Sequence, residues 1–268
     1  MITYPNTKIN LGLHVRFKRE DGFHEIDSVF YPVQWCDALE ICKADSGVSS
    51  SFSGLKIGGE SKDNLIEKAF HLMALDHNLS GMTYHLDKKI PMGAGLGGGS
   101  SDAAFAIQMI NECFDLNLKS KEFNHYAAQL GSDINFFLEN KPARCFGRGE
   151  LVEPIDFSLK GMYIALINPN IHISTKDAYS DVYKEDRLID FDRMKKEGVH
   201  SWKEFLVNDF EHSVFKIAPE IKGLKESLYD QGAIYASMTG SGSTVYGLFE
   251  TRPDIKTSYD QLWVGELG

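Results

Sequence analysis

The residues with the clearest chemical potential in this chain form a glycine-rich run that leads into small residues. In order, the run comprises Pro91, Met92, Gly93, Ala94, Gly95, Leu96, Gly97, Gly98, Gly99, Ser100 and Ser101. Glycines let backbone N–H groups converge without obstruction by Cβ atoms, and a following helix presents unpaired N–H groups and the positive end of its dipole. This composition is typical of a phosphate cradle, with the two serine hydroxyls placed to reach phosphate oxygens or a Mg²⁺ shell.

The spacing of this run fits neither of the two common nucleotide loops. No lysine follows Gly99, as a G-x-x-x-x-G-K-[ST] loop requires, and no acidic residue is suitably placed downstream for a dinucleotide motif. At this point two interpretations remain open, which are a different phosphate loop and a flexible surface turn leading into an alanine-rich helix.

Two charged residues could act directly on a transferred phosphoryl group. Lys8 is the one cation in an otherwise apolar and small-residue segment, where strand alternation would put it on one face with Asn10. Asp133 is the last residue of the triplet Gly131-Ser132-Asp133, and it precedes an apolar, helix-like run. A carboxylate there could accept a proton from an attacking hydroxyl, or it could simply be a helix N-cap. Lys8 could likewise lie on a solvated strand face.

Three segments in this order resemble the signature motifs of the GHMP kinases, the family named for galactose, homoserine, mevalonate and phosphomevalonate kinases. They are residues 5–13 (PNTKINLGL), the glycine-rich run and residues 238–245 (MTGSGSTV). Residues 21–24 (DGFH) and the doubled form GGGSSD resemble one branch of the family. That branch phosphorylates the 2-hydroxyl of 4-diphosphocytidyl-2-C-methyl-D-erythritol in non-mevalonate isoprenoid precursor biosynthesis.

The resemblance implies an α+β fold with two lobes and the active site in the cleft between them. It implies an ATP-binding N-terminal domain over residues 1–156, which carries the glycine-rich loop, and a C-terminal domain over residues 157–268. It also implies ATP and Mg²⁺ as cofactors, with Mg²⁺ bound largely through the ATP phosphates. In this pattern Lys8 and Asp133 form the catalytic pair.

The same resemblance assigns the binding residues. The nucleotide would be held by residues 91–101 together with Asn64, Leu65 and Lys68. The acceptor substrate would contact Asn10, Phe23, His24, Tyr179, Gly240 and Ser241. Phe23 departs from the tyrosine usual before this histidine, but it keeps an aromatic face for a cytosine ring. The segment around Tyr179 matches the family less well and lacks the prolines often found there.

Local patterns predict the elements that position these residues. Residues 9–17 and 25–33 should form a hairpin, and residues 37–43 should continue its sheet. Helices are expected over 63–77, 100–113 and 121–130, and a strand over 82–90 leads into the glycine-rich run. Short paired strands are expected over 143–154 and one strand over 163–168. Helices should dominate 175–231, before strands at 233–238 and 243–249.

Bulk properties exclude several classes of protein. The net charge of −10 disfavours a nucleic-acid surface, and no apolar stretch is long enough to span a bilayer, so we expect a cytoplasmic protein. The family resemblance implies a small-molecule substrate. Four cysteines without a C-x-x-C pair predict neither a disulfide framework nor a structural metal site. The sequence leaves the oligomeric state open.

Two rival functions follow from the same motifs. A kinase for homoserine, mevalonate or a sugar would share the fold but would have no need for an aromatic and histidine pair that recognises cytosine. A nucleotide-binding regulator would share the fold without turnover, but such a protein would have no physical need for Lys8 and Asp133 beside a phosphate cradle.

Overall fold

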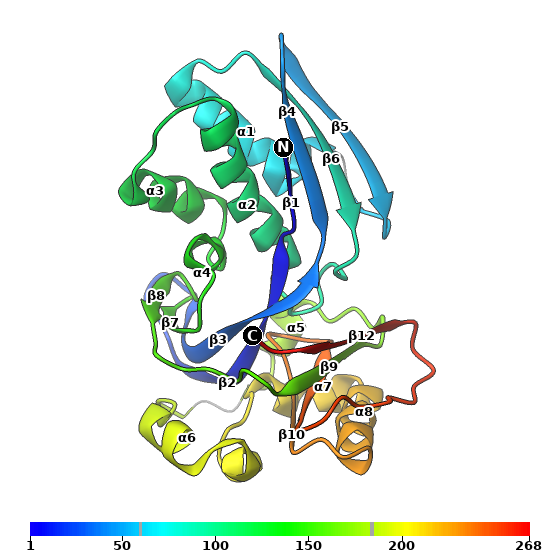
Figure 1. Ribbon diagram of the computed structural model, residues 1–268. Helices are drawn as coiled ribbons and strands as arrows, with labels where there is room; N and C mark the ends of the chain where they lie inside the picture. The colour runs from blue at the N-terminus through cyan, green and yellow to red at the C-terminus, as the bar shows by residue number, and fades with distance from the viewer. Residues whose placement is uncertain (59–60, 183–184) are drawn as a thin grey trace. The chain divides into compact units, whose positions relative to one another are not determined.

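The computed structural model describes residues 1–58, 61–182 and 185–268. By contacts, the chain divides into two compact units built from interleaved segments (Figure 1). Unit 1 comprises residues 1–7, 35–92 and 97–141, and unit 2 comprises residues 8–34, 93–96 and 142–268.

The described residues form strands and helices throughout both units. The strands are β1 (Ile2–Thr3), β2 (Asn6–Lys18), β3 (His24–Cys36), β4 (Ala38–Ala44), β5 (Gly47–Gly54), β6 (Gly81–Lys88), β7 (Ala143–Gly147), β8 (Leu151–Pro154), β9 (Tyr163–Asn168), β10 (Tyr235–Met238), β11 (Val245–Phe249) and β12 (Gln261–Glu266). The α-helices are α1 (Leu65–His77), α2 (Gly98–Cys113), α3 (Ser120–Leu130), α4 (Ile134–Glu139), α5 (Thr175–Ala178), α6 (Phe191–Glu197), α7 (Phe210–Ile217) and α8 (Pro219–Asp230). Two 3₁₀ turns are η1 (Ser61–Asp63) and η2 (Val199–Glu204).

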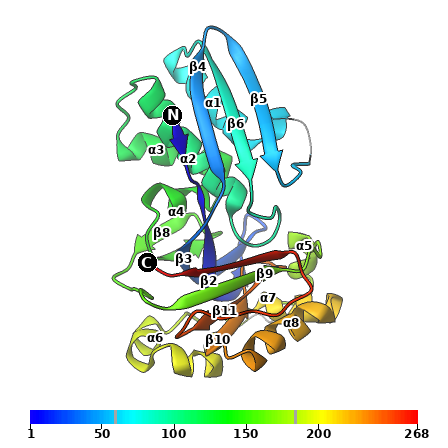
Figure 2. The same ribbon diagram turned by 45° about the vertical axis from the view of Figure 1, so that its right-hand side comes forward.

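Unit 1 is a four-stranded sheet covered by helices on one face. The strand order is β1-β4-β6-β5, in which β4 runs antiparallel to β6 and β5 runs parallel to it. Helices α1 and α2 pack against each other, and α2 also packs against β4, as both views show (Figure 2). The interface is apolar, since Leu39 and Ile41 on β4 and Ile107 and Ile110 on α2 are completely buried. This packing fixes the start of α2 relative to the sheet.

Local signals explain where the two principal helices of unit 1 begin. Helix α1 starts after Asn64, whose side-chain oxygen accepts a 2.9 Å hydrogen bond from the backbone N–H of Ile66. It ends at Asn78, which adopts the left-handed conformation at φ 51°. Helix α2 starts after Gly97, which has φ 70° and therefore a conformation that favours glycine.

Unit 2 contains two further sheets and the C-terminal helices. One sheet has the order β2-β3-β7-β8, and the other has the order β10-β11-β9-β12. Helix α8 packs on β10 and β11, and α7 packs on α8 and α5 (Figure 2). A continuous apolar core joins these elements and includes Val15, Ile167, Val214 and Ile221.

Most expected elements are confirmed, and one expected sheet arrangement is wrong. Residues 37–43 do not continue the sheet of the hairpin, because β4 pairs with β1 and β6 instead of with β3. Three strands, β1, β5 and β12, were not expected. Strand β5 reads GVSSSFSG, and its four serines give no apolar alternation from which a strand could be predicted.

Residues 175–231 are helical in part, as expected. Four α-helices and one 3₁₀ turn occupy much of the described part of this range. Across residues 1–58, 61–182 and 185–268, the structure contains no helix with the length and hydropathy needed to cross a bilayer.

Candidate functional site

Unit 1 contains a cavity of about 470 Å³ beside the start of helix α2. Its described lining comes from the end of β5 and the segment after it, from the start of α1, and from both sides of the glycine-rich run. These residues are Phe52, Ser53, Gly54, Leu55, Lys56, Ile57, Gly58, Asp63, Asn64, Leu65, Leu86, Lys88, Met92, Gly99 and Asp102. Small-molecule sites are commonly concave and mostly apolar with a few polar groups, and this cavity has that character.

The start of helix α2 gives the cavity the properties of an anion site. The helix is 16 residues long, and its first turn contains no acidic residue that would compete with a bound phosphate. Gly99 faces the cavity, where an added Cβ would meet nothing closer than Leu65 Cδ1 at 4.0 Å. A backbone this open can be approached closely by a phosphate oxygen. Ser100 is half-buried, whereas Ser101 is completely buried and its Oγ makes no hydrogen bond with any described residue.

The three predicted adenine-side residues differ in their placement. Asn64 and Leu65 both line the cavity, and Asn64 is also the N-cap of α1, so the two interpretations of this residue are compatible. Lys68 lies one turn further along α1, 4.0 Å from Asp63, and is not among the described lining residues. A nucleotide contact by Lys68 stays a prediction.

A buried cluster of three charged side chains lies behind the cavity wall. Lys88 Nζ donates to Asp37 Oδ2 and, at 2.8 Å, to Asp102 Oδ2. Asp37 Oδ1 accepts the backbone N–H groups of Lys89 at 2.5 Å and Ile90 at 2.8 Å, which anchors the end of β6 just before the glycine-rich run. All three charged residues are at most 3% exposed. Lys88 and Asp102 also line the cavity, so the cluster connects the sheet, the loop and helix α2.

This cluster holds one cation against two carboxylates. Burial raises the pKa of Asp102, the Lys88 ammonium opposes that rise, and repulsion from Asp37 adds to it, which brings the pKa of Asp102 to about 7. The two carboxylates raise the pKa of Lys88, against the effect of its burial. Asp102 Oδ1 accepts no hydrogen bond from any described residue and is completely buried. The cluster is therefore short of hydrogen-bond donors.

In unit 2 the three signature segments meet through Asn10. Its Oδ1 accepts from Lys8 Nζ at 2.7 Å and from the backbone N–H of Gly240 at 2.9 Å, and its Nδ2 donates to Ser28 Oγ at 2.8 Å. The hydroxyl of Thr239 accepts the Asn10 backbone N–H at 3.1 Å and lies 3.1 Å from the carbonyl of Gly95. Segments separated by up to 230 positions in the sequence thus form one hydrogen-bonded group.

The first half of the glycine-rich run lies directly against the loop of the third motif. An added Cβ at Gly95, which has φ 77°, would come within 2.0 Å of the carbonyl oxygen of Thr239, so no larger residue fits. The backbone N–H of Thr244 donates to the carbonyl of Ala94 at 3.3 Å, and that of Lys8 donates to the carbonyl of Leu96 at 3.1 Å. Gly240 is buried in this contact, whereas Ser241 is half-buried in the loop between β10 and β11.

The two predicted catalytic residues belong to different units. Lys8, in unit 2, is 3% exposed and its Nζ lies 4.3 Å from the centre of the Phe30 ring. Asp133, in unit 1, occupies the N-cap position of α4, but its side chain makes no capping hydrogen bond. A purely structural N-cap therefore does not explain Asp133. The pairing of these two residues stays a prediction.

The predicted cytosine-binding residues form two aromatic contacts in unit 2. The rings of His24 and Tyr179 stack with centroids 4.6 Å apart and an interplanar angle of 16°. Phe23, 53% exposed, lies at the turn before β3, and the guanidinium of Arg148 sits 4.6 Å from its ring centre. The fold thus brings His24 and Tyr179, which are far apart in sequence, into one aromatic stack. A planar base does not fit between His24 and Tyr179 while their rings touch. A base would therefore stack on a ring face of these aromatic residues other than the two faces that meet in this pair.

Sequence reasoning missed part of the cavity wall and its charged cluster. Lys88 lies three residues before Pro91, and Asp102 follows Ser101 directly. Their positions on either side of the glycine-rich run are the signal that could have identified them. Their partner Asp37, and the segment that follows β5, are far from the run in sequence, and only the fold brings them to the cavity.

Comparison with known proteins identifies two family models in this chain. Residues 64–139 match the GHMP kinases N terminal domain, and residues 191–263 match the GHMP kinases C terminal domain. The first match includes the start of α1, the glycine-rich run and Asp133. The two matches fall on either side of residue 156, while a domain division at that residue stays a prediction.

Individual relatives and solved structures agree with these models. The 4-diphosphocytidyl-2-C-methyl-D-erythritol kinase of Bacteroides thetaiotaomicron is 48% identical over 253 residues, which cover 93% of this chain and 92% of the relative. The enzyme of the same name from Cytophaga hutchinsonii is 47% identical and covers 95% and 94% of the two chains. A crystal structure of 4-(cytidine 5'-diphospho)-2C-methyl-D-erythritol kinase superposes with a TM-score of 0.84 at 28% identity, covering 100% and 99%. A mevalonate kinase from L. major shares the fold, with a TM-score of 0.66 at 17% identity, covering 94% and 87%.

Proposed function

The chain belongs to the GHMP kinase family, and from this premise we propose that it phosphorylates the 2-hydroxyl of 4-diphosphocytidyl-2-C-methyl-D-erythritol with ATP. The products would be the 2-phosphate and ADP, a step in non-mevalonate isoprenoid precursor biosynthesis. The observation that carries this choice of substrate is the stacked pair of His24 and Tyr179. Flat aromatic surfaces and a neighbouring histidine suit a pyrimidine base, whereas mevalonate, homoserine and galactose contain no ring of this kind.

The nucleotide side of the reaction belongs to the cavity of unit 1. Asn64 and Leu65 would contact the base. The run of residues 91–101, of which Met92 and Gly99 line the cavity, would surround the phosphates with the backbone N–H groups of its residues after Pro91. ATP supplies the phosphoryl group, and Mg²⁺ bound mainly to its phosphates would neutralise part of their charge. Within the described residues, no group of three or more His, Cys, Asp and Glu side chains is arranged to hold a metal ion by itself.

The acceptor side would use the hydrogen-bonded group around Asn10. The attacking hydroxyl oxygen forms a bond to the γ-phosphorus, the bond from that phosphorus to the bridging oxygen of ADP breaks, and the hydroxyl proton passes to Asp133. The ammonium of Lys8 would stabilise negative charge on the transferred group. Asn10 orients that ammonium through its 2.7 Å hydrogen bond, while Gly240 and Ser241 would approach the acceptor substrate through their loop.

A substrate panel tests this proposal directly. Purified protein with Mg-ATP should release ADP with 4-diphosphocytidyl-2-C-methyl-D-erythritol, and not with mevalonate, homoserine or galactose. The Asp133→Ala variant should lose at least about a hundredfold in kcat and still bind ATP, since general base catalysis typically contributes about 10²–10⁴-fold.

Other outcomes would redirect the assignment. Turnover of another alcohol would keep the family and change the substrate. ATP binding without turnover of any alcohol would favour a nucleotide-binding regulator. Near-normal turnover by Asp133→Ala would remove Asp133 from the proton transfer.

A further inference from the structure

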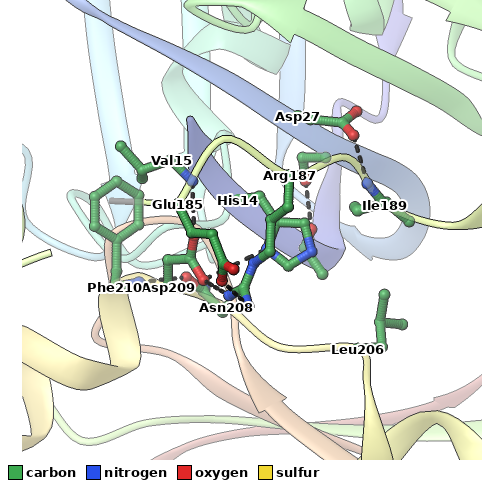
Figure 3. Close-up of polar contacts among 12 residues, drawn as sticks. His14, Val15, Asp27, Glu185, Arg187, Ile189, Leu206, Asn208, Asp209 and Phe210 are labelled. Atoms are coloured by element: carbon green, nitrogen blue, oxygen red, sulfur yellow. Dashed lines mark hydrogen bonds and ion pairs between the residues drawn. The ribbon is translucent and has the colours of Figure 1, made fainter. Parts of the chain in front are cut away.

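Three consecutive residues at the start of helix α7 contact three substrate-side elements of unit 2, which are the loop of the third motif, strand β2 and Tyr179. Asn208, Asp209 and Phe210 are 2%, 4% and 4% exposed, and none of them belongs to a signature motif. Figure 3 shows the contacts of Asp209 with Val15 and Arg187. Each makes a separate set of contacts.

Asn208 holds the loop of the third motif. Its Nδ2 donates to the carbonyl oxygens of Met238 at 2.7 Å and Gly240 at 2.9 Å, so both amide hydrogens are used. Its Oδ1 accepts the backbone N–H of Phe210 at 3.0 Å. A side chain that both donates twice and accepts at a buried position fixes its own orientation and that of the carbonyls it contacts. The backbone of Gly240, which donates to Asn10, is thereby held from its other end.

Asp209 holds strand β2, which carries Lys8 and Asn10. Its Oδ2 accepts the backbone N–H of Val15 at 2.9 Å, and its own backbone N–H donates to the carbonyl of Leu13 at 2.8 Å. Its Oδ1 accepts from Arg187 Nη2 at 2.5 Å and lies 3.4 Å from His14 Nδ1 (Figure 3). This carboxylate therefore fixes the strand beyond the signature segment.

Phe210 holds the aromatic pair. Its ring meets the ring of Tyr179 edge to face, with centroids 4.7 Å apart and an interplanar angle of 86°. Tyr179 also stacks on the ring of His24. One turn along α7, the hydroxyl of Ser213 donates at 2.5 Å to the carbonyl of Ala178, the residue before Tyr179. Helix α7 thus fixes both the backbone and the ring plane of Tyr179.

We propose that Asn208, Asp209 and Phe210 form a positioning segment for the acceptor-substrate site, in which Phe210 determines specificity for a pyrimidine base by fixing the ring plane of Tyr179. The proposal rests on the proposed function, because it concerns the geometry of the same site. The three residues act through Gly240, β2 and Tyr179, and are positioning residues. A rigid supporting shell of this kind is what holds binding groups in productive geometry.

The experiment compares Phe210→Leu with Phe215→Leu. Phe215 lies on the same helix and packs, partly buried, against the apolar core that contains Phe210, so the second variant is a control for lost aromatic packing. An edge-to-face pair contributes about 0.5–1.5 kcal/mol, which corresponds to roughly a twofold to tenfold change in affinity. Phe210→Leu should raise KM for the cytidine substrate by about that factor, with KM for ATP unchanged. Phe210→Tyr keeps the aromatic ring and should therefore have the wild-type KM for the cytidine substrate.

A second variant tests the other end of the segment. Asn208→Asp keeps the acceptor for the Phe210 N–H but faces the carbonyls of Met238 and Gly240 with an oxygen, so kcat should fall at least about tenfold while KM for ATP stays constant. Equal KM values for Phe210→Leu and Phe215→Leu, or wild-type kcat in Asn208→Asp, would overturn the proposal. Absence of cytidine-substrate turnover in the wild type would instead contradict the proposed function, and would remove this inference with it.

Discussion

Two buried charge clusters, one in each unit, are built from similar residues with opposite balance. In unit 1, the single cation Lys88 serves the carboxylates of Asp37 and Asp102. In unit 2, the single carboxylate of Asp209 serves Arg187, His14 and a backbone N–H (Figure 3). The first cluster is short of hydrogen-bond donors to its carboxylates. In the second cluster both carboxylate oxygens of Asp209 accept hydrogen bonds.

The pKa directions express this difference. Burial brings the pKa of Asp102 to about 7 even with Lys88 beside it. Burial also acts to raise the pKa of Asp209, but hydrogen bonds from His14 and Val15, with the charge of Arg187, outweigh it and lower that pKa below its ordinary value. A cluster short of donors beside a cavity can respond to a ligand, while a saturated cluster serves to hold its neighbours in place. This contrast matches the roles inferred for the nucleotide and acceptor sides.

The largest expected difference concerns removal of the cation. Lys88→Met leaves two buried carboxylates against each other and should lower the free energy of unfolding by about 3–5 kcal/mol. Arg187→Met should cost only about 1 kcal/mol, because the Arg187 side chain is 35% exposed and Asp209 keeps its other donors. Urea denaturation of both variants measures this. Equal losses in the two variants would break the distinction between the clusters.

A smaller effect, of opposite sign in the two units, is expected in the pH dependence of stability. The pKa of Asp102 is higher in the folded state than in the unfolded chain, so its contribution to stability is present at low pH and is lost as the pH rises through about 7. The pKa of Asp209 is lowered on folding, so its contribution is present at neutral pH and is lost as the pH falls through its folded value, below 3.8.

Two carboxamide variants isolate these contributions. In the wild type the free energy of unfolding should fall by on the order of 1–3 kcal/mol between pH 5 and pH 8 as Asp102 ionises. Asp102→Asn mimics the protonated acid and should abolish this fall. Asp209→Asn should be less stable than the wild type at pH 7, with a deficit that shrinks below about pH 4. Thermal unfolding across this pH range measures both profiles. Parallel profiles for the two variants would contradict the difference in charge balance.

The elements that carry motifs could be predicted from sequence because their signals are local. The glycines before α2, the N-cap at Asn64 and the alternating apolar residues of β2 each specify their own conformation. The α+β class and the strand leading into the glycine-rich run follow from these signals. The family resemblance added the assignment to the GHMP kinases, which the family models then confirmed.

The parts that could not be predicted depend on contacts between distant segments. Strand β5 has no apolar alternation and is recognisable only through its pairing with β6. Asp37 looks like an ordinary residue between two strands until the fold places it on Lys88. The Asn208–Phe210 segment lies about 30 residues from the loop that it holds, and its residue types are common at any helix start.

The central claim is that unit 1 binds the nucleotide and unit 2 binds the cytidine substrate. Two variants test it by calorimetric titration with a non-hydrolysable ATP analogue and, separately, with 4-diphosphocytidyl-2-C-methyl-D-erythritol. Gly99→Ala adds a methyl group to the cavity with no contact closer than 4.0 Å, so the fold should be kept. Tyr179→Leu removes the stacked ring and keeps an apolar side chain.

We expect Gly99→Ala to weaken nucleotide binding about tenfold and leave the affinity for the cytidine substrate unchanged, because the methyl group occupies space that a phosphate needs. Tyr179→Leu should weaken binding of the cytidine substrate and leave the affinity for the nucleotide unchanged, since base stacking contributes about 1–3 kcal/mol. Loss of affinity for the cytidine substrate in Gly99→Ala, or for the nucleotide in Tyr179→Leu, at unchanged thermal stability, would contradict the assignment of the two ligands to the two units.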